Sequence, residues 1–341
     1  MKKIIFIFVV AILLFGCFDG ETPANQTIVN NNQTQQNNTP ITIVIGGQTN
    51  QTIGANITIE PPDNNTIYTE ELEYTYQPDQ SFGVYFIDVG SDTHGNAVFV
   101  KKGDLDILID AGPEAMGNKV VDFLRSKGVD DLELIISTSA DPRQYGGIPT
   151  ILNNFVVEQY WWGDDSFGDP NYDAILDSMI DKTKSVKIIK AGMSVDLNGM
   201  NFTFINPQTD KFNNINNDAV VTRIIDRNFS LLLTSGIQKG AQGKLITKYG
   251  QLIKTKILQA PYYGVGEGTS DIGVFLVNAN PTNIIITGSS DDSATNGGSR
   301  EPFKKLLTQY NMKWNDTYTD GTIRIFSDGY EYSISALGSG Q

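Results

Sequence analysis

The chain has 341 residues, a formal net charge of -14, one cysteine and one histidine. A single cysteine cannot form an internal disulfide, and one imidazole with one thiolate cannot supply the several ligands of a tight zinc site. An acidic chain without a concentrated run of Lys and Arg is poorly suited to hold nucleic acid by counterion release, so nucleic acid is not expected as a partner.

The first residues predict an export signal. Lys2 and Lys3 precede an apolar run over residues 4–15, which is shorter than the roughly 20 residues that a membrane-spanning helix needs. The tetrad Leu14-Phe15-Gly16-Cys17 resembles a lipobox, in which the signal is cut before a cysteine that carries lipid. We predict a lipoprotein signal peptide at 1–16 and a mature protein anchored through Cys17 to the extracellular face of the cell membrane. An ordinary signal peptide with an incidental cysteine is the alternative.

Residues 17–69 are predicted to form a disordered stalk. The segment is dominated by Asn, Gln and Thr, and it cannot bury enough apolar surface to offset its ordering entropy. Asn-x-Thr sequons in an exposed stalk can carry glycans. The candidate glycosylation sites are Asn25, Asn32, Asn37, Asn50, Asn56 and Asn64.

Residues 70–341 are enough for one large domain with its own core. β-branched and aromatic residues predict strands at 83–89, 97–101 and 106–110. Residues 116–127 carry apolar side chains at helical spacing and stop at Gly128, which predicts a helix. A strand at 132–137 and a helix at 148–155 follow.

The second half of the domain repeats this order. The predicted elements are strands at 202–205, 219–225 and 229–234, a helix at 241–249, strands at 256–259 and 283–287, a helix at 300–310, and strands at 322–326 and 330–335. Two strand-rich halves with helices predict an α/β (α+β) fold in which two sheets pack face to face with helices outside.

Several segments carry family-like motifs in a consistent order. Phe86-Ile87-Asp88-Val89-Gly90 ends the first strand, Leu108-Ile109-Asp110-Ala111-Gly112 ends the third, and Thr319-Asp320-Gly321-Thr322-Ile323 lies near the end. These motifs resemble the ComEC-type competence-related hydrolase domain of the metallo-β-lactamase superfamily. The resemblance covers residues 83–335 and implies a four-layer αβ/βα sandwich. It also implies that Asp88, Asp110 and Asp320 belong to the family's structural motifs.

The same resemblance indicates where the metal ligands of the family would lie. They are an H-x-H-x-D-H run before Gly146-Gly147, a bridging aspartate after a strand, and the motif P-H-H-G. The corresponding positions in this chain are Ser139, Asp141, Arg143, Gln144, Gly236, Tyr262 and Tyr263. Arg143 would place a fixed positive charge near a former metal position. We therefore expect no metal, no other cofactor and no residue acting as a zinc-dependent catalyst.

Two further groups of residues leave alternatives open. A cluster of carboxylates could hold calcium or magnesium, or its members could stabilise loops, with Asp141 paired to Arg143. These carboxylates are Asp110, Asp141, Asp218, Asp291 and Asp292. His94 could act as a general base or be an ordinary loop residue. Aromatic residues could fill the vacated cleft or form a ligand surface; they are Tyr145, Tyr160, Trp161, Trp162, Tyr262 and Tyr263.

The sequence thus predicts a non-catalytic surface lipoprotein that binds a surface protein or a glycan with its remodelled cleft. One alternative is a nuclease-like or phosphodiesterase-like hydrolase with a carboxylate-bound divalent cation. Another is an accessory factor in DNA uptake, which depends on analogy to the family alone.

Overall fold

The computed structural model describes residues 41–42, 54–55, 58–59, 81–90, 94–163, 165–288 and 299–338. All of these belong to one compact unit, Thr39–Gln341. The predicted signal peptide, Cys17, the six stalk sequons, Asp291 and Asp292 lie outside the described residues and remain predictions. No helix in the described part of the chain is long and apolar enough to cross a bilayer.

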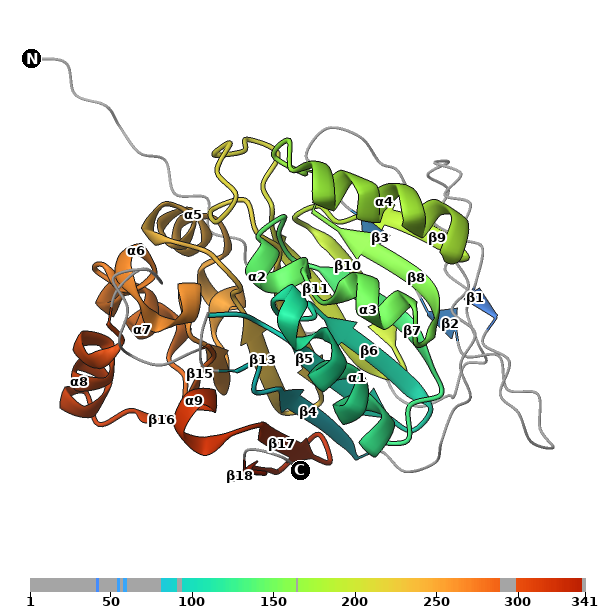
Figure 1. The fold of residues 1–341 in the computed structure, drawn as a ribbon. Helices are drawn as coiled ribbons and strands as arrows, with labels where there is room; N and C mark the ends of the chain where they lie inside the picture. Colours follow the sequence, from blue (N-terminus) through green and yellow to red (C-terminus); the bar gives the residue numbers. More distant parts are fainter. Residues whose placement is uncertain are drawn as a thin grey trace, which may run out of the picture. The chain divides into compact units, whose positions relative to one another are not determined.

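Two eight-stranded sheets pack face to face (Figure 1). In the order in which the strands lie, the first sheet consists of β18 (Tyr332–Ala336), β17 (Ile323–Ser327), β4 (Phe82–Phe86), β5 (Val98–Lys102), β6 (Leu105–Ile109), β7 (Asp131–Ser137), β8 (Val156–Trp162) and β9 (Ser185–Ile188). The second consists of β16 (Lys313–Asp316), β15 (Asn283–Ile286), β14 (Ile257–Gln259), β13 (Phe229–Leu233), β12 (Val221–Asp226), β11 (Met200–Asn206), β10 (Met193–Leu197) and β3 (Thr58–Ile59).

The two sheets repeat one topology. In the first, β4, β5 and β6 form an antiparallel meander, and β7, β8 and β9 continue parallel to β6. In the second, β10 to β13 are antiparallel, and β14, β15 and β16 continue parallel to β13. The repeated order predicted from the sequence is therefore confirmed. Two short pairings involve residues of the predicted stalk: β1 (Ile41–Thr42) pairs with β2 (Gly54–Ala55), and β3 pairs with β10 at the edge of the second sheet.

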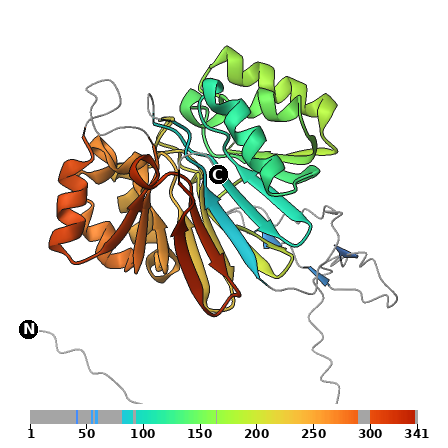
Figure 2. The same ribbon diagram turned by 60° about the horizontal axis from the view of Figure 1, so that its bottom comes forward.

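Helices cover both outer faces of the sandwich (Figure 2). The first sheet is covered by α1 (Gly117–Ser126), α3 (Ile148–Leu152) and α4 (Pro170–Lys182), and the second by α5 (Lys239–Tyr249), α7 (Gly273–Ala279) and α8 (Glu301–Gln309). Shorter helical turns are η1 (Glu114–Met116), α2 (Pro142–Tyr145), η2 (Gly250–Ile253), η3 (Pro261–Gly264), α6 (Gly266–Thr269) and α9 (Thr317–Asp320). The predicted four-layer αβ/βα sandwich is confirmed.

Helix α4 was not predicted from the sequence, and its residues explain why. Asp169 caps its first turn and Pro170 occupies the first helical position, which favours a helix start. Only Tyr172, Ile175 and Met179 are buried, however. This narrow apolar stripe gives a weaker periodic signal than the wide stripe of α1.

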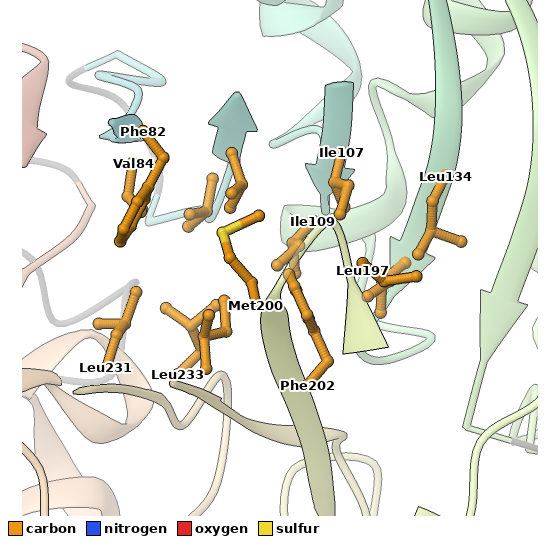
Figure 3. Packing of buried hydrophobic residues seen from close by; sticks show 14 of the residues in the cluster. Phe82, Val84, Ile107, Ile109, Leu134, Leu197, Met200, Phe202, Leu231 and Leu233 are labelled. Atoms are coloured by element: carbon orange, nitrogen blue, oxygen red, sulfur yellow. The ribbon is translucent and has the colours of Figure 1, made fainter. Parts of the chain in front are cut away.

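The core between the sheets is built from alternating strand residues. In β10, Met193, Val195 and Leu197 point inward and the residues between them are half-buried, because successive side chains of a strand face opposite sides. Figure 3 shows this layer, with Ile107 and Leu134 facing Phe202 and neighbours from the second sheet. Strand β7 is buried on both faces after its first residue, so it has a continuous apolar run.

Candidate functional site

Strand ends from both sheets bring the predicted metal-site positions together. Asp110 follows β6 and Ser235 follows β13, with φ values of 59° and 51°. Tyr262 and Tyr263 in η3 have φ values of 46° and 60°. Left-handed backbone is costly for residues other than glycine and often occurs at functional sites. Hydrogen bonds and ring contacts join these loops to the segment that begins α2.

Asp141 and Arg143 form an ion pair within one turn. Asp141 is the N-cap of α2, and its Oδ1 accepts the Arg143 backbone N–H at 2.9 Å. The Arg143 side chain donates from Nε to both carboxylate oxygens at 3.0 Å and from Nη2 to Oδ2 at 2.5 Å. The pairing that the sequence offered as an alternative to a cation site is confirmed.

The Arg143 guanidinium also lies against the tyrosine pair that replaces the family's histidines. Its central carbon is 5.4 Å from the Tyr262 ring centroid and 5.1 Å from that of Tyr263, within the range of cation–π attraction. Burial acts to lower the pKa of Arg143, but its bonds to Asp141 and the neighbouring tyrosines raise that pKa above its ordinary value. A permanent cation therefore occupies this part of the cleft.

A buried hydrogen-bond network links the remaining positions across the two halves. The Thr138 backbone N–H and hydroxyl donate to the Asp110 carboxylate at 2.8 and 2.6 Å. The Ser235 hydroxyl lies 2.6 Å from Thr138 Oγ1 and donates to Gln144 Oε1 at 3.2 Å. Gln144 Nε2 donates to the Tyr263 hydroxyl oxygen at 3.0 Å. Each of these side chains is satisfied by its neighbours, which is what a buried polar cluster requires.

Burial favours the uncharged forms of the ionisable groups in this network. Burial raises the pKa of Asp110 to about 7, although the two Thr138 hydrogen bonds act to lower it. Burial also raises the pKa of Tyr263 well above its usual value, which keeps the phenol protonated. Hydroxyl and amide groups that bind one another are poor ligands for a transition metal.

A loop from the second half closes over the former bridging-ligand position. A Cβ added to Gly236 would lie 3.3 Å from Asn216 Oδ1 and 3.4 Å from Gln144 Nε2. The Ser139 hydroxyl donates to the Ile215 carbonyl oxygen at 3.1 Å, and Ile215 packs against the core beneath the helices of the first sheet. Neighbouring side chains therefore limit the space beside Gly236.

His94 belongs to this site, although the sequence favoured an ordinary loop residue. Its ring is fully buried and stacks on Tyr263, with centroids 5.3 Å apart and an interplanar angle of 14°. Gly288 makes room for it, since a Cβ on Gly288 would lie 2.6 Å from His94 Nδ1. Thr138 and Ser235 were not predicted as site residues. The only indication in the sequence was that each comes shortly after a buried strand.

The three described carboxylates of the proposed cation site, Asp110, Asp141 and Asp218, are not gathered into one cluster. Asp218 accepts the backbone N–H groups of Phe212 and Asn214 at 2.8 and 3.0 Å, so it holds its own loop. Asp141 is bound by Arg143 and Asp110 by Thr138. Within the described residues, no group of three or more His, Cys, Asp or Glu side chains is arranged to hold a metal. The residues present do not fit the metal centre that the family resemblance implies.

The other motif aspartates stabilise local structure. Asp88 accepts the Gly90 backbone N–H at 3.0 Å and pairs with Lys119 at 2.6 Å. Asp320 in α9 accepts from the Asn315 side-chain amide at 3.0 Å and from the Asp316 backbone at 3.2 Å. Among the described residues, neither Asp88 nor Asp320 is hydrogen-bonded to the network around Asp110.

Most of the candidate aromatics fill volume. Tyr160 and Trp161 are buried in the cores on the two faces of the first sheet. The Tyr145 hydroxyl donates to Asp169 at 2.9 Å, and its ring lies 4.8 Å from that of Tyr172. Tyr262 is half-buried beside Arg143. The buried aromatic residues therefore fill space in the core, as one of the two alternatives predicted. Tyr262 is partly exposed at the surface of the site.

A surface groove adjoins Arg143 on the helical side of the first sheet. It has a volume of about 690 Å³ and runs between η1, α2, α3 and α4. Its floor is mainly apolar, and cationic side chains line it where α2 begins and where α4 ends. Lining residues include Arg143, Tyr145, Pro149, Leu152, Ile175 and Lys182.

Comparison with known sequences gives one relative. No protein-family model matches the chain. The chain is 22% identical over 264 residues to ComE operon protein 3 of Bacillus subtilis strain 168, a match that covers 71% of this chain and 32% of that protein. The chain thus spans about one third of the length of this relative.

Comparison with solved structures gives proteins of one fold. The metallo-β-lactamase fold protein YhfI of Bacillus subtilis is 13% identical, with a TM-score of 0.49 over 72% of this chain and 99% of that chain. Zinc-bound PqqB of Methylobacterium extorquens is 11% identical, with a TM-score of 0.47 over 71% and 99%. The sheet order and the helices on both outer faces agree with the motifs found in the sequence. The chain is a four-layer αβ/βα sandwich of the metallo-β-lactamase type, and its sequence is similar to that of ComE operon protein 3.

Proposed function

We propose that this protein is a lipid-anchored, non-catalytic binding protein on the outer face of the cell membrane. The observation that supports it most directly is the replacement of metal ligands by groups that bind one another. Arg143 is held by Asp141, and Gln144, Thr138, Ser235 and Asp110 form one buried network. A hydrolase that activates water on a metal needs open metal positions, and side chains that bind one another are not free to supply them.

The groove beside Arg143 is the proposed binding surface for a surface protein or a glycan. The Arg143 side chain is 25% exposed, lines the groove, and is oriented by Asp141 and the Tyr262 ring. A preorganised arginine next to an apolar floor can fix the orientation of a ligand while the floor supplies contact area. The Asp141–Arg143 ion pair would thus hold the binding residue in place.

The absence of metal-dependent catalysis is tested with purified protein and its Asp141→Ala variant. We expect no stoichiometric zinc or manganese in elemental analysis, and no hydrolysis of a phosphodiester or of DNA above the rate of a buffer blank in Mg²⁺, Mn²⁺ or Ca²⁺. The variant should show the same blank rate. Hydrolysis by the wild-type chain that is lost in Asp141→Ala would contradict the proposal and favour a carboxylate-bound cation.

The anchor is tested by fractionating cells that express the wild-type chain or its Cys17→Ser variant. The wild-type protein should partition into the detergent phase of a Triton X-114 separation and carry a lipid mass on its N-terminal residue. Cys17→Ser should lose that mass and leave the lipoprotein processing pathway. Equal partitioning and identical N-terminal masses for both chains would exclude lipid attachment at Cys17.

A role in DNA uptake is the second candidate, and the similarity to ComE operon protein 3 favours it. In that role the chain would act beside a channel without cutting DNA itself. Electrophoretic mobility shifts with single- and double-stranded DNA at low salt would test direct contact. No shift at low salt, where charge attraction is strongest, would remove the version of this role in which the chain binds DNA.

A further inference from the structure

Strand β18 presents a free edge of the first sheet. Among the strands that the structure describes, it pairs with β17 alone, in an unbroken antiparallel register. Just beyond the strand, the Leu337 N–H donates to the Thr322 carbonyl at 2.8 Å. Hydrogen-bonded pairs recur at every second residue of an antiparallel ladder. Ser335 and Ser333 therefore direct their backbone groups toward β17.

The intervening residues direct their backbone groups away from the sheet. Tyr332, Ile334 and Ala336 each carry one N–H and one carbonyl on the outer side of β18. Tyr332 and Ile334 are half-buried and their side chains pack against the core between the sheets. The packing of these side chains holds the edge in place, and no other described strand pairs with its outward backbone groups.

This edge lacks the protection found on the other sheet edges that the structure describes. Strand β9 contains Lys187, β16 contains Lys313, and β3 has two residues. Lysines and short edge strands are common means of preventing unwanted strand pairing. Strand β18 reads Tyr-Ser-Ile-Ser-Ala, without charge, proline or a break in register. A bare edge of this kind is suited to strand addition by a partner.

The outer face next to β18 carries a cation that has no anionic partner among the described residues. Arg324 and Phe326 of β17 lie opposite Ser335 and Ser333 in the register. The Arg324 guanidinium carbon lies 4.6 Å from the Phe326 ring centroid, and Phe326 is 38% exposed. Arg324 has no hydrogen bond or ion pair with any described residue, and its Nε is buried. In a chain with 39 acidic and 25 basic side chains, an unpaired, half-buried arginine indicates an anionic partner.

We propose that β18 accepts an extended segment of a partner protein as an added antiparallel strand. The segment carries an acidic residue opposite Ser335 and an apolar residue opposite Ser333, in the order acidic, any residue, apolar. The added strand lies roughly 10 Å from β17, two strand spacings away. The small serines leave this distance open, so that a glutamate can reach Arg324 and the apolar residue can contact Phe326. This surface is separate from the groove beside Arg143, so the two proposals can fail independently.

The test uses the full chain and a labelled peptide in which Glu-Thr-Leu lies between flanking threonine and valine residues. Fluorescence anisotropy should show saturable binding, at least 10-fold tighter than for the same peptide with Lys in place of Glu. Hydrogen exchange should slow at the amides of Tyr332, Ile334 and Ala336 when the peptide binds. The Ser333 and Ser335 amides, already bonded to β17, should change little.

Two variants separate strand addition from other modes of binding. Ile334→Pro removes an outward N–H without breaking a bond to β17, so binding should be lost; because Ile334 also packs against the core, this variant should melt at a lower temperature and is assayed below that temperature. Arg324→Glu should reverse the preference between the two peptides, so that the lysine peptide binds more tightly than the glutamate peptide. This result can be read even if the proline variant does not fold. Lys313→Ala, on the guarded edge of β16, is the matched control and should bind as the wild type does.

Three results would overturn the proposal. The first is equal affinity for the acidic and lysine peptides, and the second is unchanged binding by Ile334→Pro. The third is a wild-type chain that forms a dimer and an Ile334→Pro variant that is a monomer, with neither chain binding the peptide. That result would assign the edge to a second copy of the chain.

Discussion

Replacing Lys102 by alanine is expected to lower the free energy of unfolding by about 3–5 kcal/mol. Lys102 lies on β5 of the first sheet, and its Nζ is 2.7 Å from Asp226 Oδ2 on β12 of the second, with the two side chains 1% and 2% exposed. The variant leaves a buried carboxylate with one remaining partner, Arg227 Nε at 2.8 Å. Urea denaturation of both chains at one pH measures the difference.

An exposed ion pair of the same residue types provides the control. Lys239 pairs with Asp271 at the surface, where the side chains are 57% and 73% exposed. Lys239→Ala should cost far less than Lys102→Ala, because solvent and salt screen such pairs. The double variant Lys102→Met with Asp226→Leu should be more stable than Lys102→Ala, since it leaves no buried carboxylate that has lost its lysine. Equal costs for Lys102→Ala and Lys239→Ala would contradict the role assigned to this pair.

The wild-type chain is expected to lose stability as the pH rises from about 5 to about 8, and Glu133→Gln should remove much of this loss. Glu133 on β7 accepts the Asp106 backbone N–H at 2.6 Å, and the two side chains are 4% and 1% exposed. Burial raises the pKa of Glu133 to about 8, helped by the charges of Asp106 and Asp131. Burial also raises the pKa of Asp106 to about 7, although Lys101 acts to lower it.

The direction follows from proton linkage. A carboxyl group whose pKa is higher in the folded state than in the unfolded state favours folding while it is protonated. That contribution is complete below its unfolded pKa, near 4.3, and is lost as the pH rises through the folded value near 8. The slope contributed by one such group is at most about 1.4 kcal/mol per pH unit.

Urea denaturation from pH 5 to pH 9 measures this effect as a difference between variants. Glu133→Gln keeps the acceptor for the Asp106 N–H and imitates the protonated acid, so it should match the wild type near pH 5. By pH 8 to 9 it should be more stable by a few kcal/mol. Glu331→Gln, in an exposed turn, should follow the wild-type curve throughout. Parallel curves for Glu133→Gln and the wild type would show that Glu133 is ionised at no cost in the folded state.

Periodicity and motif order predicted most of the sandwich. The strands at 106–110 and 229–234 appear as β6 and β13 within a residue of the predicted bounds, because buried strands carry local β-branched and aromatic patterns. The helix predicted at 148–155 ends at Leu152, and the chain then turns into β8. Such boundaries are set by hydrogen bonds to distant segments, which local patterns do not contain.

The sequence predicted which residues lie at the candidate site, but it did not predict the contacts between them. The motifs placed Asp141, Gln144 and Tyr263 at the former metal positions, and the structure brings these segments together. The sequence suggested that the tyrosines fill space. It did not reveal that Gln144 joins Tyr263 to Ser235, because these residues are 119 and 91 positions away from Gln144.

By itself, the sequence determined that a metal centre of the family type lacks its ligands, since this conclusion needs only the identities of residues and a chain with one histidine and one cysteine. It also determined the order of the strands and the two-sheet sandwich, because alternation and helical spacing are local. Only the tertiary structure decided which contacts the residues at the predicted metal-site positions make. The Arg143–Asp141 pair, the stack of His94 on Tyr263 and the unguarded edge of β18 depend on which strand ends and strand edges meet or stay free. Those contacts arise from packing between segments far apart in the chain, and no local pattern encodes them.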